Sequence, residues 1–259
     1  MASNEYGYIG VHADQSASAK SGVFTVNDQK VLDDDGKWTA DGVTNGRVFY
    51  IDAANPASYS GSGNSVTDID NSVAGSNSGT QTLYSSDGGG SFYFNATGGI
   101  DFPDITALNT QNKTIIVWVK ANPAQAGFLF EKGAVNTQYS LFFNNSTSMY
   151  FRNKDTNPDH DLSFNPSAHF SSSAYTMIIA WHSGTAKRVY KNGSTLITSA
   201  TTGSADGTTN SSGIRVGEYN NNGYLLTGYI GLVKVFNRGL TAAELDLEYD
   251  TYKARFGLS

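Results

Sequence analysis

Three acidic residues near the C-terminal end have a spacing that could support acid–base chemistry. Glu244, Asp246 and Glu248 alternate with leucines in the segment ELDLE. On a β-strand, alternate side chains lie on one face, so three carboxylates would share one side of a cleft. Two of them about 5 Å apart could act as nucleophile and general acid in glycoside hydrolysis with retention of configuration. The spacing therefore raises the hypothesis of a glycoside hydrolase.

The surrounding residues predict a helix rather than a strand. Thr241 and Glu244 have the spacing of a capping box. On a helix Asp246 points about 200° away from Glu244, so the carboxylates cannot converge. We expect an amphipathic helix of about four turns that packs on a sheet and keeps these carboxylates on its solvated side. Its apolar side chains recur at helical intervals at Leu245, Tyr249, Tyr252 and Phe256.

The segment DTNPDHD (155–161) offers a candidate cation site, because oxygen-bearing side chains alternate as they do at the start of a calcium loop. His160 stands where such a loop has its turn glycine, and Pro166 stands where it has its last glutamate. Two interpretations stay open: a partial oxygen cage for calcium, the one cofactor that the sequence suggests, or a polar loop held by Pro158 and its Asx turns. The candidate ligands are Asp155, Asn157, Asp159 and Asp161.

The segment EYNNNGY (218–224) combines aromatic and amide side chains. Aromatic rings present apolar faces on which sugar rings stack, and amides bond hydroxyl groups. The alternative is a plain polar turn in which Gly223 supplies a positive φ angle. The candidate glycan contacts are Tyr219, Asn220, Asn221, Asn222 and Tyr224.

Short β-type runs separated by turn signals recur from residue 46 to residue 238, without helical patterns between them. This organisation predicts an all-β antiparallel two-sheet sandwich or barrel. TIIVWVKA (114–121) is almost continuously apolar and predicts a strand buried on both faces, whereas the mixed YTMIIAWHS (175–183) predicts a strand nearer an edge. The pair Asn192-Gly193 predicts a tight hairpin.

Residues 1–45 differ from the rest of the chain. They contain one short alternating run and a triple-Asp turn, and Phe24 and Trp38 are the candidate anchors of an arm that docks to a partner. The first residues have neither a basic nor an apolar leader segment, so we do not expect export by a signal peptide.

The composition argues against two classes of partner. The net charge is −6, only 15% of residues are charged, and Lys and Arg do not cluster, so phosphate-driven binding of nucleic acid is not expected. No apolar run approaches the ~20 residues of a membrane span, so no membrane partner is expected. Because the chain has no cysteine, disulfides and thiolate metal sites are excluded.

Several segments, taken in order, resemble a known family. They are FYIDAANPASYSGSGNSVTDIDNS, GGGSFYFNATGGIDFPD, TIIVWVKA, YKNG and GYIGLVKVFNRGLTAAELDLEYDTYKARFGL. They are similar to the laminin-G-like or concanavalin A-like jelly-roll domain of virion structural proteins of tailed bacteriophages, over roughly residues 47–258. The first residues also resemble the openings of cyanophage structural proteins.

The resemblance implies a jelly-roll sandwich (46–238) with an extended N-terminal docking arm (1–45) and a C-terminal helix packed on the sandwich (239–259). Residues 55–72 would form a rim loop anchored by Tyr59. The implied function is a non-enzymatic virion structural protein, either a capsid decoration or head fibre or a tail appendage, made in the host cytoplasm and exposed on the virion surface.

The implied partners are other virion proteins and further copies of the chain. The alternative is a carbohydrate-binding, receptor-recognition module that contacts a host-surface glycan. A third possibility, a glycoside hydrolase, would need residues 244–248 on a strand in a cleft.

Overall fold

The computed structural model describes residues 42–133, 139–153, 161–201, 212–219 and 224–259. The chain divides into the units Met1–Asn45 and Gly46–Ser259, and the second contains all of the strands and helices given below. The candidate anchors of the arm, Phe24 and Trp38, lie outside the described residues.

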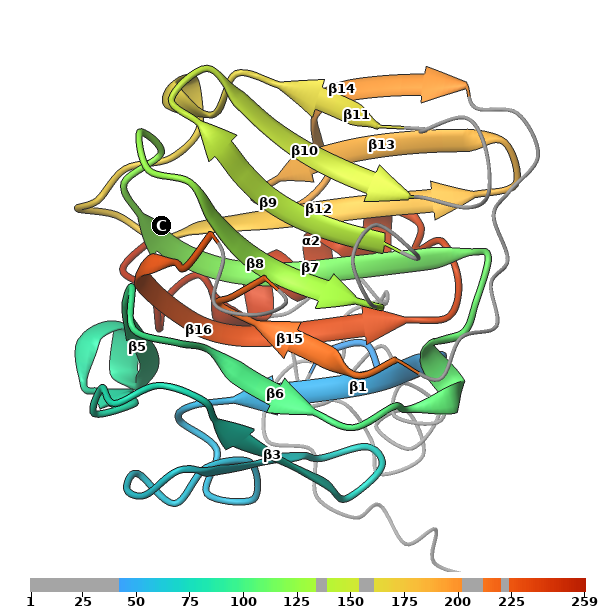
Figure 1. Ribbon diagram of the computed structural model, residues 1–259. Helices are drawn as coiled ribbons and strands as arrows, with labels where there is room; N and C mark the ends of the chain where they lie inside the picture. Colours follow the sequence, from blue (N-terminus) through green and yellow to red (C-terminus); the bar gives the residue numbers. More distant parts are fainter. Residues whose placement is uncertain (1–41, 134–138, 154–160, 202–211, 220–223) are drawn as a thin grey trace, which may run out of the picture. The chain divides into compact units, whose positions relative to one another are not determined.

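Two antiparallel sheets, each of eight strands within the described residues, form the predicted sandwich (Figure 1). Sheet A has the order β14 (Thr195–Thr201), β13 (Ala186–Lys191), β12 (Thr176–Ser183), β7 (Lys113–Ala121), β16 (Thr227–Phe236), β5 (Ser91–Asn95) and β4 (Tyr84–Ser85), and β1 (Arg47–Asp52) also pairs with β16. Sheet B has the order β11 (Leu162–Phe164), β10 (Ser148–Asn153), β9 (Tyr139–Asn145), β8 (Gly127–Lys132), β15 (Ile214–Val216), β6 (Ile100–Phe102), β3 (Val73–Asn77) and β2 (Ser65–Asp68). Short 3₁₀ turns occupy η1 (Asp87–Gly89), η2 (Thr106–Leu108) and η3 (Pro166–Ala168).

The core lies between the sheets and is filled by alternate side chains of their inner faces. Strand β7 is buried on both faces, as its apolar sequence predicts. Residues 175–183 lie one strand nearer the edge of sheet A than β7, as expected, but β12 is still an internal strand, because it pairs with both β7 and β13. Two of its polar side chains have partners inside the protein: the Thr176 hydroxyl donates to the His169 carbonyl (3.0 Å), and His182 Nδ1 lies 3.0 Å from the Gln111 carbonyl.

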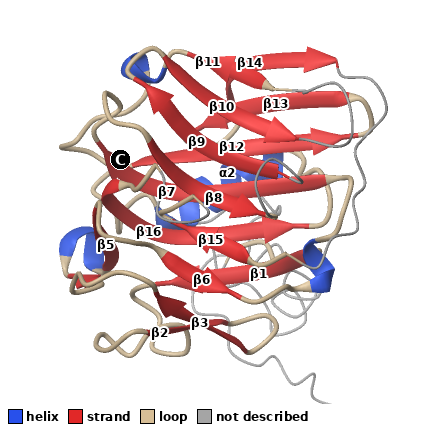
Figure 2. Ribbon diagram, in the orientation of Figure 1, coloured by secondary structure: helices blue, strands red, loops and turns tan. Residues whose placement is uncertain are grey.

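Helix α2 (Ala242–Tyr252) covers the outer face of sheet A (Figure 2). Its capping box is confirmed: Glu244 accepts from the Thr241 amide (2.8 Å), and the Thr241 hydroxyl accepts from the Glu244 amide (3.3 Å). The regular helix has 11 residues, about one turn fewer than expected. The Trp118 ring of β7 stacks on Phe256 beyond the helix at a centroid distance of 4.4 Å, which fixes the C-terminal segment on the sheet.

The three alternating carboxylates are on this helix and have structural partners. Glu248 is not on the solvated side: it forms a buried ion pair with Lys234 of β16 (2.9 Å), and both side chains are 0% exposed. Asp246 accepts from the Ser194 amide (2.8 Å), and Glu244 pairs with Arg238 (2.6 Å). The strand that the hydrolase hypothesis requires is therefore a helix.

Two local predictions are confirmed. Asn192 and Gly193 both have positive φ angles (46° and 89°) between β13 and β14, as a tight hairpin requires. Tyr59 is buried and its hydroxyl donates to the Gly63 carbonyl (2.8 Å), so it anchors the loop that follows β1. Within the described part of the chain, no helix has the length and apolar character needed to cross a membrane.

Replacing Glu248 by alanine should destabilise the fold strongly. The change leaves the Lys234 ammonium buried without its carboxylate, and breaking one partner of a buried pair costs about 3–5 kcal/mol. Urea denaturation measures this loss. Asp250→Ala, which removes the surface pair of Asp250 with Lys253, is the control and should change the free energy of unfolding by less than about 1 kcal/mol. Equal effects of the two substitutions on the free energy of unfolding would contradict the conclusion that Glu248 and Lys234 form a buried, stabilising ion pair.

Candidate functional site

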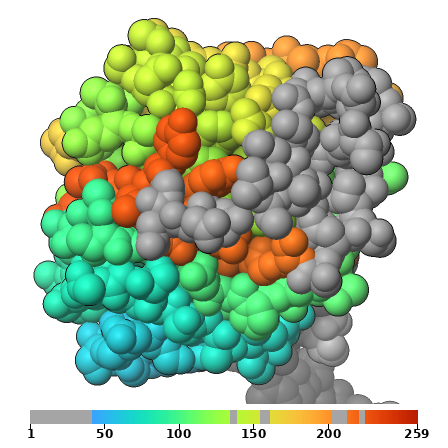
Figure 3. All heavy atoms as spheres, viewed as in Figure 1, coloured from blue at the N-terminus to red at the C-terminus, as the bar shows by residue number. Residues whose placement is uncertain are grey.

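The outer face of sheet B lies on the side of the sandwich opposite helix α2, and segments from distant parts of the sequence meet on it (Figures 1 and 3). A ladder of stacked aromatic rings crosses three of its strands. The rings of Phe128 (β8) and Phe142 (β9) lie 4.4 Å apart with an interplanar angle of 4°, and Tyr150 (β10) follows 5.4 Å from Phe142. Because these rings stack on one another, the ladder stiffens this part of the sheet.

A β-bulge decides which aromatic side chains of β8 join the ladder. The pairing of β8 with β9 shifts between Phe128 and Phe130. The bulge turns both Leu129 and Phe130 into the core, while Phe128 and Glu131 remain on the outer face. Strict alternation along GFLFEK would have placed Phe128 and Phe130 on the same face of the sheet.

Two of the predicted glycan contacts extend the ladder. Tyr219 lies 4.8 Å from Phe128, and Tyr224 lies 6.2 Å from the same ring. The two tyrosines are 6.1 Å apart at an angle of 85°, so they form a corner rather than a continued stack. Tyr224 is 51% exposed and offers ring surface to a ligand. The other predicted contacts, Asn220, Asn221 and Asn222, lie outside the described residues.

Tyr224 is held in a strained backbone conformation. Its φ angle is +47°, in the left-handed region that a bulky side chain rarely adopts. Its carbonyl accepts a hydrogen bond from the Phe128 amide (3.1 Å), which ties this residue to the start of β8. Such strain persists where the surrounding structure imposes it, and it is typical of binding sites.

A row of polar side chains runs beside the aromatic ladder and crosses seven strands. The register pairs each member directly with the next, so all of them share the outer face. In order from β2 to β10, the row consists of Ser65, Ser76, Asp101, Arg215, Glu131, Ser140 and Arg152.

The charged side chains of this row form ion pairs with one another or with Asp161. Arg215 lies 3.4 Å from both Asp101 and Glu131. Arg152 pairs with Asp161 (3.0 Å) and lies over the Phe142 ring. The row therefore has hydrogen-bonding groups at fixed positions but little unpaired positive charge.

The calcium hypothesis rested on residues that are mostly outside the described chain, namely Asp155, Asn157 and Asp159. The remaining candidate, Asp161, accepts hydrogen bonds from the Arg152 guanidinium with both of its oxygens. Among the described residues, no three His, Cys, Asp or Glu side chains form a group that could hold a metal ion.

Glu218 lies between the polar row and the aromatic corner, the pair of rings formed by Tyr219 and Tyr224. It precedes Tyr219 in the sequence, and its side chain contacts a residue of the row. Its carboxylate accepts from the Ser78 hydroxyl (2.8 Å) and lies within hydrogen-bonding reach of Asp101. Burial, reinforced by the neighbouring charge of Asp101, raises the pKa of Glu218 from 4.5 to about 7. At neutral pH the Glu218 carboxyl group is therefore partly protonated.

This raised pKa predicts a pH-dependent stability. Between about pH 4.5 and 7 the folded protein keeps the proton of Glu218 and the unfolded chain releases it, so the free energy of unfolding falls as the pH rises through this interval. Glu218→Gln should remove a decline on the order of 2 kcal/mol. Denaturant titrations at pH 5 and pH 8 measure it, and parallel profiles of the two proteins would contradict the shift.

The sequence pointed to the tyrosines but missed the polar row. Asp101, Arg215 and Glu131 lie on three short strands that are far apart in the sequence, and only the pairing of β6, β15 and β8 brings them together. The alternation of Ile214, Arg215 and Val216 was the one local signal that Arg215 faces outward.

Comparison with known proteins places this geometry in a familiar architecture. A family model described as the concanavalin A-like lectin/glucanases superfamily, of the Laminin_G_3 type, matches residues 94–246. A search of curated protein sequences gives no match.

Solved structures with similar folds include binding domains of clostridial toxins. The binding domain of botulinum neurotoxin serotype D/C has a TM-score of 0.63 at 13% identity, covering 83% of this chain and 53% of the toxin chain. The binding domain of Paraclostridial mosquitocidal protein 1 has a TM-score of 0.64 at 16% identity, covering 83% and 55%. The binding domain of botulinum neurotoxin DC, solved in complex with SialylT, has a TM-score of 0.63 at 12% identity, covering 83% and 52%. The chain thus spans about half the length of these structures, and the likeness is one of fold.

Proposed function

The chain belongs to the concanavalin A-like lectin/glucanase superfamily, and from this premise we propose that it is a non-enzymatic carbohydrate-binding module whose site is the outer face of sheet B. Members of one fold can be lectins or enzymes, so the proposal is argued from the site itself.

One observation carries the proposal: the aromatic corner of Tyr219 and Tyr224 beside the polar row. An exposed ring offers a surface on which a pyranose can stack, and carboxylate and guanidinium groups at fixed positions can bond its hydroxyls. Tyr224 keeps a strained backbone and an exposed ring, although neither contributes to the hydrophobic core. Both features are typical of a residue retained for binding.

Two observations argue against hydrolysis. The carboxylates at 244–248 lie on a helix and have structural partners. On the outer face of sheet B, Asp101 and Glu218 are in direct contact, whereas glycoside hydrolysis needs two carboxyl groups about 5 Å or more apart to flank the scissile bond. The third carboxylate there, Glu131, is separated from Asp101 by the Arg215 guanidinium, which pairs with both. The toxin domains of similar fold are also named as binding domains.

Removing the exposed ring should weaken glycan binding without unfolding the protein. Tyr224→Ala deletes the stacking surface, and we expect the affinity for a glycan bound by the wild type to fall at least tenfold. A glycan array identifies the glycan, and calorimetry measures the affinity.

Tyr84→Ala is the matched control for this substitution. Tyr84 is also an exposed tyrosine, 37% exposed, but it lies on β4 of sheet A. The control should bind like the wild type. Equal losses in both variants, or full binding by Tyr224→Ala, would contradict the assigned site.

A second proposal concerns the particle that carries this module. The segments over residues 47–258 resemble, in order, the jelly-roll domain of tailed-bacteriophage virion proteins, and this resemblance favours a location of the chain on a virion surface. Residues 1–45 would dock to other virion proteins, and the jelly roll would be presented to a host-surface glycan. Repeated copies on such a particle would compensate for weak single contacts by avidity.

Quantitative mass spectrometry of purified particles tests this setting. A fixed ratio of the chain to the shell protein is expected for a capsid decoration, and a few copies per particle for a tail appendage. Absence of the chain from purified particles would contradict the virion setting and would leave the glycan-binding proposal in place.

A further inference from the structure

Building on the glycan-binding function proposed above, we propose that a depression at the β2–β3 hairpin is a second saccharide subsite. The bound ligand is then a neutral oligosaccharide of several sugar units that crosses the strands of sheet B, rather than a single terminal sugar. Four structural features carry this inference: the lining of the depression, its unengaged polar groups, its continuity with the aromatic corner, and its charge.

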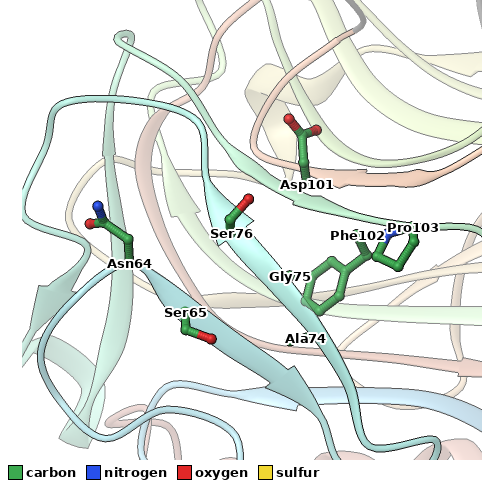
Figure 4. Close-up of a pocket in the computed structure, with 8 residues that line it drawn as sticks. All are labelled: Asn64, Ser65, Ala74, Gly75, Ser76, Asp101, Phe102 and Pro103. Atoms are coloured by element: carbon green, nitrogen blue, oxygen red, sulfur yellow. The ribbon is translucent and has the colours of Figure 1, made fainter.

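The depression has a volume of about 550 Å³ and lies between the β2–β3 hairpin and β6 (Figure 4). Ser76 and Asp101 come from neighbouring strands, and their oxygens point the same way. Gly75 is needed here, because a Cβ at this position would lie 2.6 Å from the Phe102 ring. The lining residues are Asn64, Ser65, Ala74, Gly75, Ser76, Asp101, Phe102 and Pro103.

The polar groups of the depression are available to a ligand. Within the described chain, the side chains of Asn64, Ser65 and Ser76 make no hydrogen bond, and the Asp101 side chain, although it pairs with Arg215, is 42% exposed. An amide, two hydroxyls and a carboxylate supply donors and acceptors for sugar hydroxyls. Pro103, which is exposed, supplies apolar surface for the C–H face of a pyranose.

The depression continues into the site already described. Ser65, Ser76 and Asp101 are the first members of the polar row, which proceeds through Arg215 to Glu131 on β8. Three strand spacings separate β3 from β8, a distance of about 14 Å. This span exceeds one sugar ring, so a ligand that engages both the depression and the aromatic corner must be an oligosaccharide.

The charge of the face selects a neutral ligand. Asp101, Glu131 and Glu218 surround a single guanidinium, that of Arg215, which already lies 3.4 Å from two of them. An acidic sugar placed on this row would meet carboxylates without an unpaired cation of the row to receive it. The inferred ligand class therefore differs from the sialylated compound named for the toxin complex of similar fold.

The test uses a length series of probes and three variants of the full chain. The probes are linear glucose, galactose and mannose oligosaccharides of two to six units, together with sialylated forms of the same lengths, titrated by calorimetry. Ser65→Tyr places a ring in the depression from an exposed position of β2. Thr67→Tyr is the matched control, because Thr67 is two residues along the same strand and does not line the depression. Ser76→Ala removes a hydroxyl without adding bulk.

We expect the wild type and Thr67→Tyr to bind six-unit neutral chains at least tenfold more tightly than two-unit chains. Ser65→Tyr should lose this gain, and Ser76→Ala should lower the affinity for six-unit chains several-fold. Affinity that is independent of length, a gain retained by Ser65→Tyr, or tighter binding of the sialylated probes would overturn this inference and leave the proposed function standing. Failure of the wild type to bind any probe, or any glycan of the array, would overturn both.

Discussion

The pairing register of sheet B is the constraint on which the candidate site depends. Direct cross-strand pairing places Ser65, Ser76, Asp101, Arg215 and Glu131 on one face. A slip of one residue in any of these strands would turn its polar member into the core and its apolar neighbour out to the surface. The register is strongly specified, because the inner face carries large apolar side chains such as Phe102 and Phe130 that must remain buried.

The two faces of the sandwich use their charged groups differently. On sheet A the buried pair of Lys234 and Glu248 joins the helix to β16, and its charges compensate each other in the low-dielectric interior. On sheet B three carboxyl groups surround Arg215, and burial, together with the neighbouring Asp101, raises the pKa of Glu218. An arrangement that is locally unfavourable, and that lies beside the strained Tyr224, is typical of a site kept for binding rather than for stability.

The aromatic ladder links the stability of the sheet to the geometry of the site. Phe128 and Phe142 stack within the sheet, and Tyr219 and Tyr224 rest against Phe128. The ring faces of Phe128 and Phe142 are already covered by their stacking partners. These two rings therefore support the exposed tyrosines rather than contact a ligand themselves. A rigid support reduces the conformational entropy that the two tyrosines would lose on binding.

The sequence alone determined the features that rest on local chemistry. The capping box of Thr241 and Glu244, the hairpin at Asn192-Gly193, the burial of β7 and the all-β antiparallel class all follow from short-range spacing and turn residues. The grouping of Tyr219 with Tyr224 was also visible, because only four residues lie between them. Only the tertiary structure decided that Glu248 is buried, that β12 is internal, and that the β8 bulge turns Phe128 outward. It alone assembled Asp101, Arg215, Glu131 and Glu218, because pairing between strands distant in the sequence depends on the packing of the whole core, which no local pattern encodes.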